Sequence, residues 1–398
     1  MQSKIGINRQ EMRLNPASEI ARLHQFGNVF WSDMNLRWIV LGQAEGLEVL
    51  RQETFCLPNY GPLVLNLARR LDIDLSHLYG ISQFIPFLHN GPRHEKTRNV
   101  ITRLTAQLQP AYIEHLPKAA SELLVKWSDG QPFDFSTDFA DQLHVHTLAR
   151  VIGLDPSELI GLTAKLNAEE LNFNNSVMEF VSVNSNIEFV FNELSRLTKS
   201  HTALRLYMEK IGKTLESYDL ETDFNSQIYC LATIFILGKD TISGALSLSL
   251  KQLLEENGDV INPKEILHGA HFPREMLRIS APVNLVEREA SLPCSIGAHQ
   301  IAQGDRILVV IRAMNTDPSV YACPHKASES LLEHFSFGTG IHACVGRNIA
   351  TQAVKATFAK LSEFRVLHQT DIPTMGKGRN TRKVDSLKIR IEMSDHEN

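Results

Sequence analysis

Residues 337–346 read Phe337-Gly338-Thr339-Gly340-Ile341-His342-Ala343-Cys344-Val345-Gly346, and a run with helical character, 347–354, follows at once. One cysteine therefore lies in a loop with three glycines and an aromatic residue. Glycines permit positive φ angles and let the backbone approach a flat ligand closely. The amides and the dipole of the following helix favour a thiolate at this position. A thiolate held in this way is an axial ligand that heme iron accepts.

A buried cysteine in a glycine-rich turn would explain Cys344 alone. It would not explain why the aromatic residue, the glycine spacing and His342 all occur together. The ten-residue pattern resembles the heme-ligand loop of cytochrome P450 enzymes at every defining position. The resemblance implies that Cys344 is the thiolate ligand of heme b (iron protoporphyrin IX). It also implies that Phe337, Gly338, His342 and Gly346 lie against the cofactor.

The composition excludes several classes of protein. The chain has 398 residues, 43% of them hydrophobic, and a net charge of −5, so nothing indicates a nucleic-acid partner. Its five cysteines are scattered along the chain, which is typical of a reducing compartment. The N-terminal residues lack the apolar region of a signal peptide, and no run of 18 apolar residues occurs. We therefore expect a soluble, cytoplasmic protein with no membrane anchor.

The hydrophobic periodicity predicts a mainly α fold with small β-sheets (α+β). Helices are expected from residue 16, over 44–51, over 92–154, over 156–216 with interruptions near 172–175 and 184–186, and over 225–255. Strands are expected at 29–32, 37–41, 307–311 and 387–391. The stretch 57–92, rich in proline and glycine, is expected to be irregular. The resemblance implies the cytochrome P450 fold, a single triangular-prism-like domain over 1–398, with 57–92 as one wall of the substrate pocket.

The predicted helix 225–255 contains an unusual polar step. Gly238, Asp240 and Thr241 interrupt an apolar run, and local rules that fail together often mark a functional site. We expect Gly238 to leave room for a diatomic ligand, and Asp240 and Thr241 to deliver protons to bound dioxygen. The step resembles the acid–alcohol pair of cytochrome P450 enzymes. It departs from that pattern at Leu237, where a small residue is usual, and this narrows the expected space over the heme.

Glu275 and Arg278 have the ExxR spacing, which places both on one helix face. Arg278 lies 66 residues before Cys344, and at this distance the pair resembles the family's buried ion pair that braces the cysteine loop. The role is structural. The segment 326–331 lacks the arginine that often joins the pair, so we expect either a weaker brace or one completed by another group.

Two heme propionates require cations or hydrogen-bond donors. His94 and Arg98 share a helix face at (i, i+4) spacing, Arg288 follows the ExxR segment, and His342 lies within the cysteine loop. All four match family positions that contact propionates. The histidines at 144 and 146 are expected to have ordinary packing and surface positions.

These residues predict a heme-thiolate monooxygenase that uses dioxygen and two electrons from a redox partner. Oxidative coupling, peroxide-driven oxygenation and isomerisation are alternative chemistries of the same family. The acid–alcohol pair favours dioxygen over peroxide, because peroxide users need no proton relay, but it does not exclude coupling. A non-catalytic heme-binding protein is the alternative from another class.

The resemblance also implies partners. The electron donor is expected to be a small acidic ferredoxin or a flavodoxin with its reductase. A basic patch could receive it, formed by Arg93, Lys96, Arg103, Arg347 and Lys355.

The substrate is expected to be a mid-sized, largely apolar molecule of secondary metabolism, either free or tethered to a carrier protein. The candidate pocket residues are mostly apolar, with Asn284 as a possible polar anchor. They are Leu63, Leu65, Phe84, Phe87, Phe173, Val177, Ile234, Leu237, Val283 and Asn284.

Overall fold

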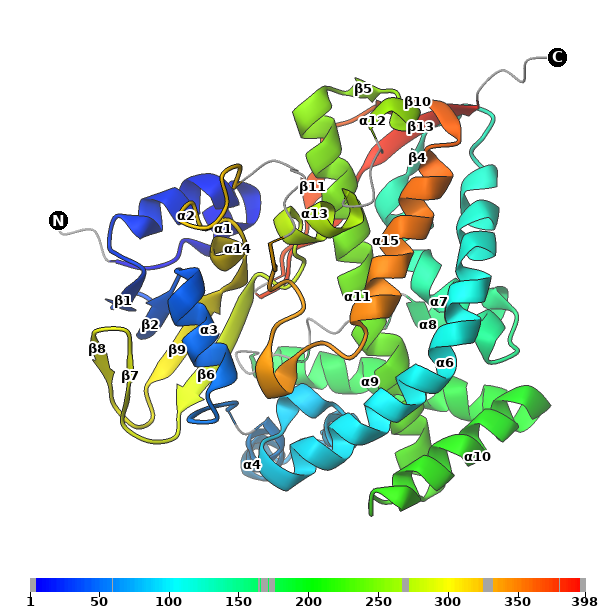
Figure 1. Cartoon of the computed structure of the whole chain (residues 1–398). Coiled ribbons are helices and arrows are strands. Elements are labelled where there is room, and N and C mark those ends of the chain that lie inside the picture. The colour runs from blue at the N-terminus through cyan, green and yellow to red at the C-terminus, as the bar shows by residue number, and fades with distance from the viewer. Residues whose placement is uncertain are drawn as a thin grey trace.

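The longest elements, α6 (Gly91–Val125) and α11 (Phe224–Asn257), belong to a bundle of helices that forms one side of the molecule (Figure 1). The computed structural model of the chain describes residues 5–58, 60–163, 165, 171, 176–266, 272–324, 332–378 and 380–393. The side chain of Asp223 caps α11 by accepting from the amides of the first turn. Its predicted range, 225–255, is therefore confirmed.

Helices make up most of the described chain, as predicted. The α-helices are α1 (Arg9–Leu14), α2 (Pro16–His24), α3 (Gln43–Arg51), α4 (Tyr60–Leu71), α5 (Ser76–Ser82), α6 and α11 as above, α7 (Asp141–Val151), α8 (Ile160–Thr163), α9 (Val177–Ser200), α10 (Thr202–Ser217), α12 (Pro263–Ile266), α13 (Phe272–Ile279), α14 (Ile311–Asn315) and α15 (Arg347–Leu361). The shorter helical turns are η1 (Pro86–Leu88), η2 (Phe135–Ala140), η3 (Pro156–Leu159) and η5 (Gly340–His342).

The larger sheet lies on the side opposite the bundle (Figure 1). Its strand order is β1-β2-β9-β6-β3, and only the β2–β9 pair is parallel. A second sheet has the order β4-β13-β10-β5, and two hairpins, β7-β8 and β11-β12, complete the strands. The strands are β1 (Val29–Ser32), β2 (Arg37–Val40), β3 (Phe55–Cys56), β4 (Phe133–Asp134), β5 (Val260–Ile261), β6 (Leu285–Ala290), β7 (Cys294–Ile296), β8 (His299–Ile301), β9 (Arg306–Val310), β10 (Phe364–Gln369), β11 (Thr374–Met375), β12 (Val384–Ser386) and β13 (Lys388–Met393).

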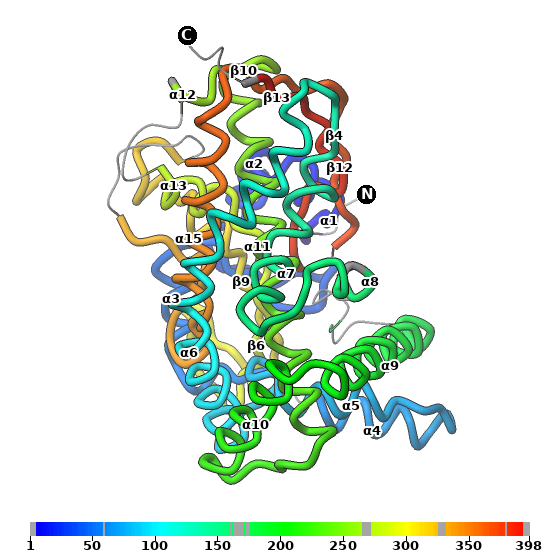
Figure 2. Tube along the Cα trace, turned by 90° about the vertical axis from the view of Figure 1, so that its right-hand side faces the viewer, coloured from blue at the N-terminus to red at the C-terminus, as the bar shows by residue number. Residues whose placement is uncertain are grey.

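The second sheet and helices α9 and α10 lie at opposite ends of the molecule. Figure 2 shows β10 and β13 at one end and α9 with α10 at the other, and Figure 1 agrees. The helices α6, α7, α11 and α15 connect these two ends and pack on one another. Among the described residues, α11 is the one helix long and apolar enough to cross a membrane, and 72% of its most apolar window is buried within the protein.

The expectation of an irregular stretch over 57–92 is wrong, because it contains α4 and α5. Gly61 and Pro62 stand in the first turn of α4, where proline costs no hydrogen bond. Gly80 lies within α5 because the ring of Tyr229 on α11 occupies the space that a side chain would need. Close packing therefore overrides the local signals of these residues.

The predicted interruption near 184–186 is also wrong, since α9 runs through it. The side chain of Asn184 is buried and accepts a hydrogen bond from the backbone amide of Leu78 at 2.9 Å. A distant backbone group thus satisfies a polar residue that disfavours helix locally. The other predicted interruption, 172–175, lies outside the described residues.

Candidate functional site

The cysteine loop lies between two fixed points. Its start is held by a hydrogen bond from the Cys344 amide to the carbonyl of Phe337 at 2.8 Å, and its end is the first turn of α15. Gly340 has a φ of +69°, and a side chain there would lie 2.5 Å from the carbonyl oxygen of Leu50. The loop therefore needs this glycine to pass under α3. The helix predicted after the loop is confirmed as α15.

Protein atoms surround the Cys344 thiol, although the residue is exposed to the space above the loop. Burial raises the pKa of this thiol, which outweighs the opposite effects of the Gly346 amide and the guanidinium groups of Arg98 and Arg347. The expectation that the loop itself lowers the thiol pKa is thus wrong in net direction. A coordinated metal ion deprotonates a thiol regardless of such a shift.

His94, Arg98, Arg288 and His342 form one group, here named the basic cluster. The rings of His94 and His342 lie 4.3 Å apart, although 248 residues separate them in the sequence. Arg98 and Arg288 act electrostatically on both rings, and Arg98 also acts on Cys344. The structure therefore brings the four predicted propionate residues together and places them beside the cysteine.

The basic cluster fits the anionic edge of a heme. His94 Nε2 and His342 Nδ1 are buried without a hydrogen-bond partner in the structure. Neither Arg98 nor Arg288 forms an ion pair with a described carboxylate, and burial lowers the pKa of Arg288 to about 10. Burial also lowers the pKa of His342 to about 3, so its ring is neutral and can donate from one nitrogen. Two propionates would satisfy these donors and neutralise the arginines.

The Glu275–Arg278 pair is buried, as predicted, with 2.9 Å between Arg278 Nη2 and Glu275 Oε2. Its brace is completed in a way that the sequence did not reveal. The guanidinium donates to the carbonyls of Asn315 and Pro324, each at 2.8 Å, and stacks over the ring of Tyr321 at 4.5 Å. The pair therefore ties α13 to the end of α14 and to the chain that leads to the cysteine loop.

Asn315 continues this brace toward the cysteine loop. Its side chain donates to the carbonyl of Arg278 and to the hydroxyl of Ser336, and it accepts from the Phe335 amide at 2.6 Å. Ser336 in turn donates to the carbonyl of Leu277. The residues just before Phe337 are thus fixed to α13 directly through Ser336 and indirectly through Asn315. Segment 326–331, considered for the missing arginine, lies outside the described residues.

The polar step of α11 differs from expectation at Gly238. A methyl group at this position would overlap the imidazole of His144 on α7, so His144 fills the space that was expected to admit a diatomic ligand. His144 is buried and shares a hydrogen bond of 3.0 Å with the hydroxyl of Tyr112. Burial lowers the pKa of His144 to about 4, an effect that the carbonyl of Ile234 partly offsets. The sequence gave no sign of this contact between α7 and α11.

The proton-relay candidates lie next to a buried lysine. Thr241 donates to the carbonyl of Leu237 at 3.1 Å, which leaves its oxygen free to accept from another group. Asp240 lies 3.5 Å from the ammonium group of Lys239, and these side chains are 14% and 8% exposed. The relay carboxylate is therefore largely buried and paired, an arrangement the sequence did not predict. A lysine within a helix usually faces solvent, and the sequence therefore did not indicate that Lys239 is buried.

The predicted substrate residues do not all share one environment. Ile234, Leu237 and Thr241 lie on one half-buried face of α11, at the (i, i+3, i+7) spacing. The others divide as follows: Leu63, Leu65 and Val283 are half-buried, Phe84 belongs to the main core, Phe87 and Val177 are exposed, Asn284 is buried beside α1, and Phe173 lies outside the described residues.

The predicted basic patch is partly neutralised. Arg93 and Lys96 form ion pairs of 3.3 and 2.6 Å with carboxylates in segment 217–221, and Arg103 donates to a serine hydroxyl there. Exposed ion pairs add little stability, but they do cancel local charge. The two bases predicted on α15 are exposed. Arg103 and α15 therefore retain the positive charge of this patch.

Comparison with known proteins agrees with this arrangement. The family profile described as Cytochrome P450 matches residues 272–385, which include the ExxR pair, Arg288 and the cysteine loop. Linalool 8-monooxygenase from Pseudomonas putida is 24% identical over 368 residues, covering 87% of this chain and 88% of that protein. The biotin biosynthesis cytochrome P450 from Bacillus subtilis (strain 168) is 25% identical over 333 residues and covers 79% of each chain.

A solved structure shows the same fold over nearly the whole length. P450BioI, determined in complex with acyl carrier protein ligated to hexadec-9Z-enoic acid, superposes with a TM-score of 0.77 at 22% identity. The match covers 96% of this chain and 100% of that one. This superposition shows the fold, whereas the profile match and the relatives show the family. The chain belongs to the cytochrome P450 family, whose members bind heme through a cysteine thiolate, and it is a bacterial-type cytochrome P450 monooxygenase.

Proposed function

We propose that this enzyme inserts oxygen into a mid-sized, largely apolar small molecule of secondary metabolism, working in the cytoplasm as one domain over residues 1–398. One observation carries the proposal. Arg98 interacts electrostatically with the Cys344 thiol and with both histidine rings of the basic cluster. Heme iron accepts a thiolate ligand, and the heme propionates require cations and hydrogen-bond donors that no protein carboxylate neutralises. The relatives support oxygenation as the reaction.

In this proposal the Cys344 thiolate would hold the heme iron, and the basic cluster would hold the propionates. Bound heme supplies dioxygen activation and the oxidation of a substrate carbon. The chain contributes position and charge. The Glu275–Arg278 brace fixes the approach to Phe337, and it would thereby hold the Cys344 thiol in position for the heme. Arg98 and Arg288 would stabilise the charge of the propionates, and neutral His94 and His342 would donate hydrogen bonds to them.

We assign proton transfer to Asp240 and Thr241. Cleavage of dioxygen consumes two protons. Side chains of the protein must deliver these protons, because the site excludes bulk water. The ammonium group of Lys239 lies 3.5 Å from the Asp240 carboxylate. The Asp240 carboxylate would take up a proton from solvent and pass it to the Thr241 oxygen. The Thr241 hydroxyl would then turn from the carbonyl of Leu237 and release its own proton toward the heme site. An Asp240→Asn variant should therefore consume NADPH with a smaller yield of product.

The half-buried apolar face of α11 supports an apolar substrate, because Leu237 lies one turn and Ile234 two turns from Thr241. The complex of P450BioI with an acyl-loaded carrier protein supports carrier-tethered molecules as one form of this substrate. We propose a ferredoxin or flavodoxin with its reductase as the electron donor, received near Arg103 and α15. Steering by opposite charge is the physical basis of this choice.

A Soret titration of purified ferric protein tests the proposal. Free apolar metabolites and carrier-bound acyl groups are added in turn, and a low-to-high-spin shift identifies the ligand that displaces water from the iron. Turnover with a surrogate ferredoxin system should then yield an oxygenated product. If ligands shift the spectrum but none gives an NADPH-dependent product, the protein is a heme binder and not a monooxygenase.

A further inference from the structure

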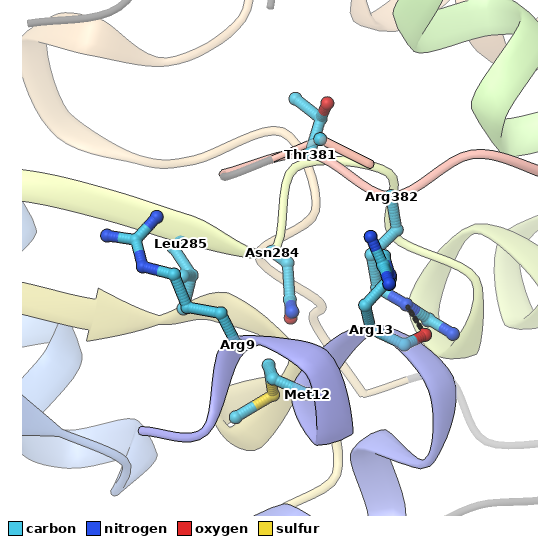
Figure 3. A pocket seen from close by; sticks show the side chains of 8 residues that line it. Arg9, Met12, Arg13, Asn284, Leu285, Thr381 and Arg382 are labelled. Carbon is cyan, nitrogen blue, oxygen red and sulfur yellow. Dashed lines mark hydrogen bonds between the residues drawn. The ribbon is translucent and has the colours of Figure 1, made fainter. Parts of the chain in front are cut away.

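A second group of cationic side chains lies away from the basic cluster, where α1 meets the start of β6 and the segment 380–382. Figure 3 shows the side chains of Arg9, Arg13, Asn284 and Arg382 around a small cavity. We name these four residues the arginine pocket. None of its three arginines was a candidate in the sequence, because each looks like an ordinary surface base.

Backbone contacts fix the walls of the arginine pocket. Arg382 donates from its side chain to the carbonyl of Arg13 at 3.3 Å and from its amide to the carbonyl of Pro282 at 2.7 Å. The Asn284 amide donates to the carbonyl of Asn380 at 2.9 Å. The pocket is therefore a built part of the fold.

The arginine pocket contains a buried cation, Arg382, and a second buried cation, Arg312, lies beside it. Arg382 and its neighbour Arg312 are buried, and each forms no ion pair with a described carboxylate. Burial lowers the pKa of Arg382, and the charge of Arg312 adds to this effect. Glu255 acts on both arginines, but it is itself paired with Lys251. Buried cations without a countercharge are costly, and a guanidinium does not deprotonate at neutral pH.

Asn284 provides an independent sign of a missing ligand. Its side chain is 3% exposed and points into the cavity, and its Oδ1 has no hydrogen-bond partner in the structure. The oxygen and nitrogen of an amide can exchange places by a flip, so either end can face a ligand. The cavity of about 10 Å³ has room for one water-sized group. One oxygen atom of a carboxylate or of a small inorganic anion matches that size, and the surrounding side chains can donate hydrogen bonds to such an oxygen.

We propose that the arginine pocket binds a carboxylate-type anion, held by Arg13, Arg382 and Asn284. Two sources share this chemistry, a free anion and the carboxylate end of the oxidised molecule. The second source rests on the proposed function. Arg382 and Pro282 pack against α11 at Gly244, where a side chain would lie 2.8 and 2.9 Å from them. Gly244 is one turn beyond Thr241, so the pocket residue Arg382 packs on α11 close to the turn that carries Thr241.

The first experiment measures the melting temperature of the ferric holoenzyme in sodium acetate, against sodium MES of equal ionic strength. MES carries a bulky sulfonate that the cavity is too small to admit. Acetate should raise the melting temperature of the wild type above the MES value. The Arg13→Met variant should lose this increment, and Arg205→Met, which removes an exposed arginine on α10, should keep it.

An equal acetate increment in Arg13→Met would overturn the proposal, as would no increment in the wild type. If Arg13→Met does not yield holoenzyme, Asn284→Leu takes its place, since it fills the cavity with an apolar group of similar size. That variant should also lose the increment. Its persistence there would show that acetate acts elsewhere.

A second experiment separates the two sources. Dodecanoate and dodecan-1-ol are titrated into the ferric enzyme and followed at the Soret band. If the ligand's own carboxylate enters the pocket, dodecanoate should bind about tenfold or more tightly than the alcohol. Arg13→Met should remove that difference. Equal binding of both compounds, together with the acetate effect, would identify a free anion as the occupant.

The two proposals fail in different ways. A wild-type protein without a heme-thiolate spectrum would contradict the proposed function, and the acetate increment would still report on the pocket. A normal spectrum with no acetate increment would contradict the pocket alone.

Discussion

Gly238 makes room for the packing of His144, although the sequence led us to expect that it makes room for a diatomic ligand. Glycine within a helix costs about 1 kcal/mol relative to alanine, so its presence in α11 needs a reason. The reason is the imidazole of His144, which occupies the volume of the missing side chain. Because Tyr112 holds that ring at 3.0 Å, the ring cannot move away freely. The two helices therefore approach closely at the turn that carries Asp240 and Thr241.

This contact predicts a coupling between the two positions. Gly238→Ala should reduce the free energy of unfolding of the holoenzyme by about 1–3 kcal/mol, because the new methyl group overpacks the site. In a His144→Ala background the same change should be neutral or stabilising, since the ring is gone. Urea unfolding of the four proteins in this double-mutant cycle measures the coupling. Strictly additive effects would show that the two residues do not touch.

His144 also predicts a pH dependence of stability. Its pKa is about 4 in the folded protein, below the ordinary value of 6.5. The unfolded chain therefore takes up the proton first as the pH falls, and the stabilisation present above pH 6.5 is lost between 6.5 and 4. The free energy of unfolding should fall about 1.4 kcal/mol per pH unit more steeply in that window than it does for His144→Gln. Equal slopes for wild type and variant would contradict the buried neutral histidine.

At the scale of elements, a buried ion pair on α13 holds the chain before the cysteine loop in position. Arg278 is bound on one side by Glu275 and on the other by backbone carbonyls from 315 and 323–324. The spacing of the pair was readable in the sequence, because (i, i+3) residues share a helix face. Its other partners were not, since they come from segments about 40 residues away that only the tertiary fold brings together.

Breaking this pair should be costly. Glu275→Gln leaves a buried guanidinium without its countercharge and should lower the free energy of unfolding by about 3–5 kcal/mol. Heme occupancy should fall with it, because the loop before Cys344 loses its support. Glu193→Gln on α9 is the matched control, since its ion pair with Arg196 has the same spacing and the same 2.9 Å distance but is exposed.

The control should cost at most about 1 kcal/mol. Denaturant unfolding and the ratio of Soret to protein absorbance measure both effects. Similar losses in the two variants would show that the Glu275–Arg278 pair does not brace the loop.

At the scale of the whole molecule, the fold class and the order of the main helices followed from periodicity and caps. Asn15-Pro16 before α2 and Asp223 before α11 are local signals, and local signals survive in the fold. The helix α5 was missed because Gly80 is there to admit Tyr229, a contact that spans about 150 residues. The arginine pocket was missed for the same reason, since α1 and segment 380–382 lie at opposite ends of the chain.

The surface over α6 and α15 predicts how the electron donor docks. Arg103→Glu should slow electron transfer from a ferredoxin about tenfold at low ionic strength and leave heme content unchanged. The effect should shrink as salt is added, because exposed charges are screened. Lys96→Gln is the control, since Lys96 is already neutralised by Asp219 at 2.6 Å. Stopped-flow reduction rates at two salt concentrations decide the matter, and unchanged rates in Arg103→Glu would reject this docking surface.

The assignment of Cys344 as the heme ligand underlies every other proposal. It is tested by the absorbance difference spectrum of the reduced protein with carbon monoxide. The wild type and a Cys323→Ser control should both give the red-shifted Soret band of a thiolate-ligated heme. Cys344→His should retain heme, held by the basic cluster, and lose that band. A wild type without the thiolate band, or a Cys344→His protein that keeps it, would contradict the assignment.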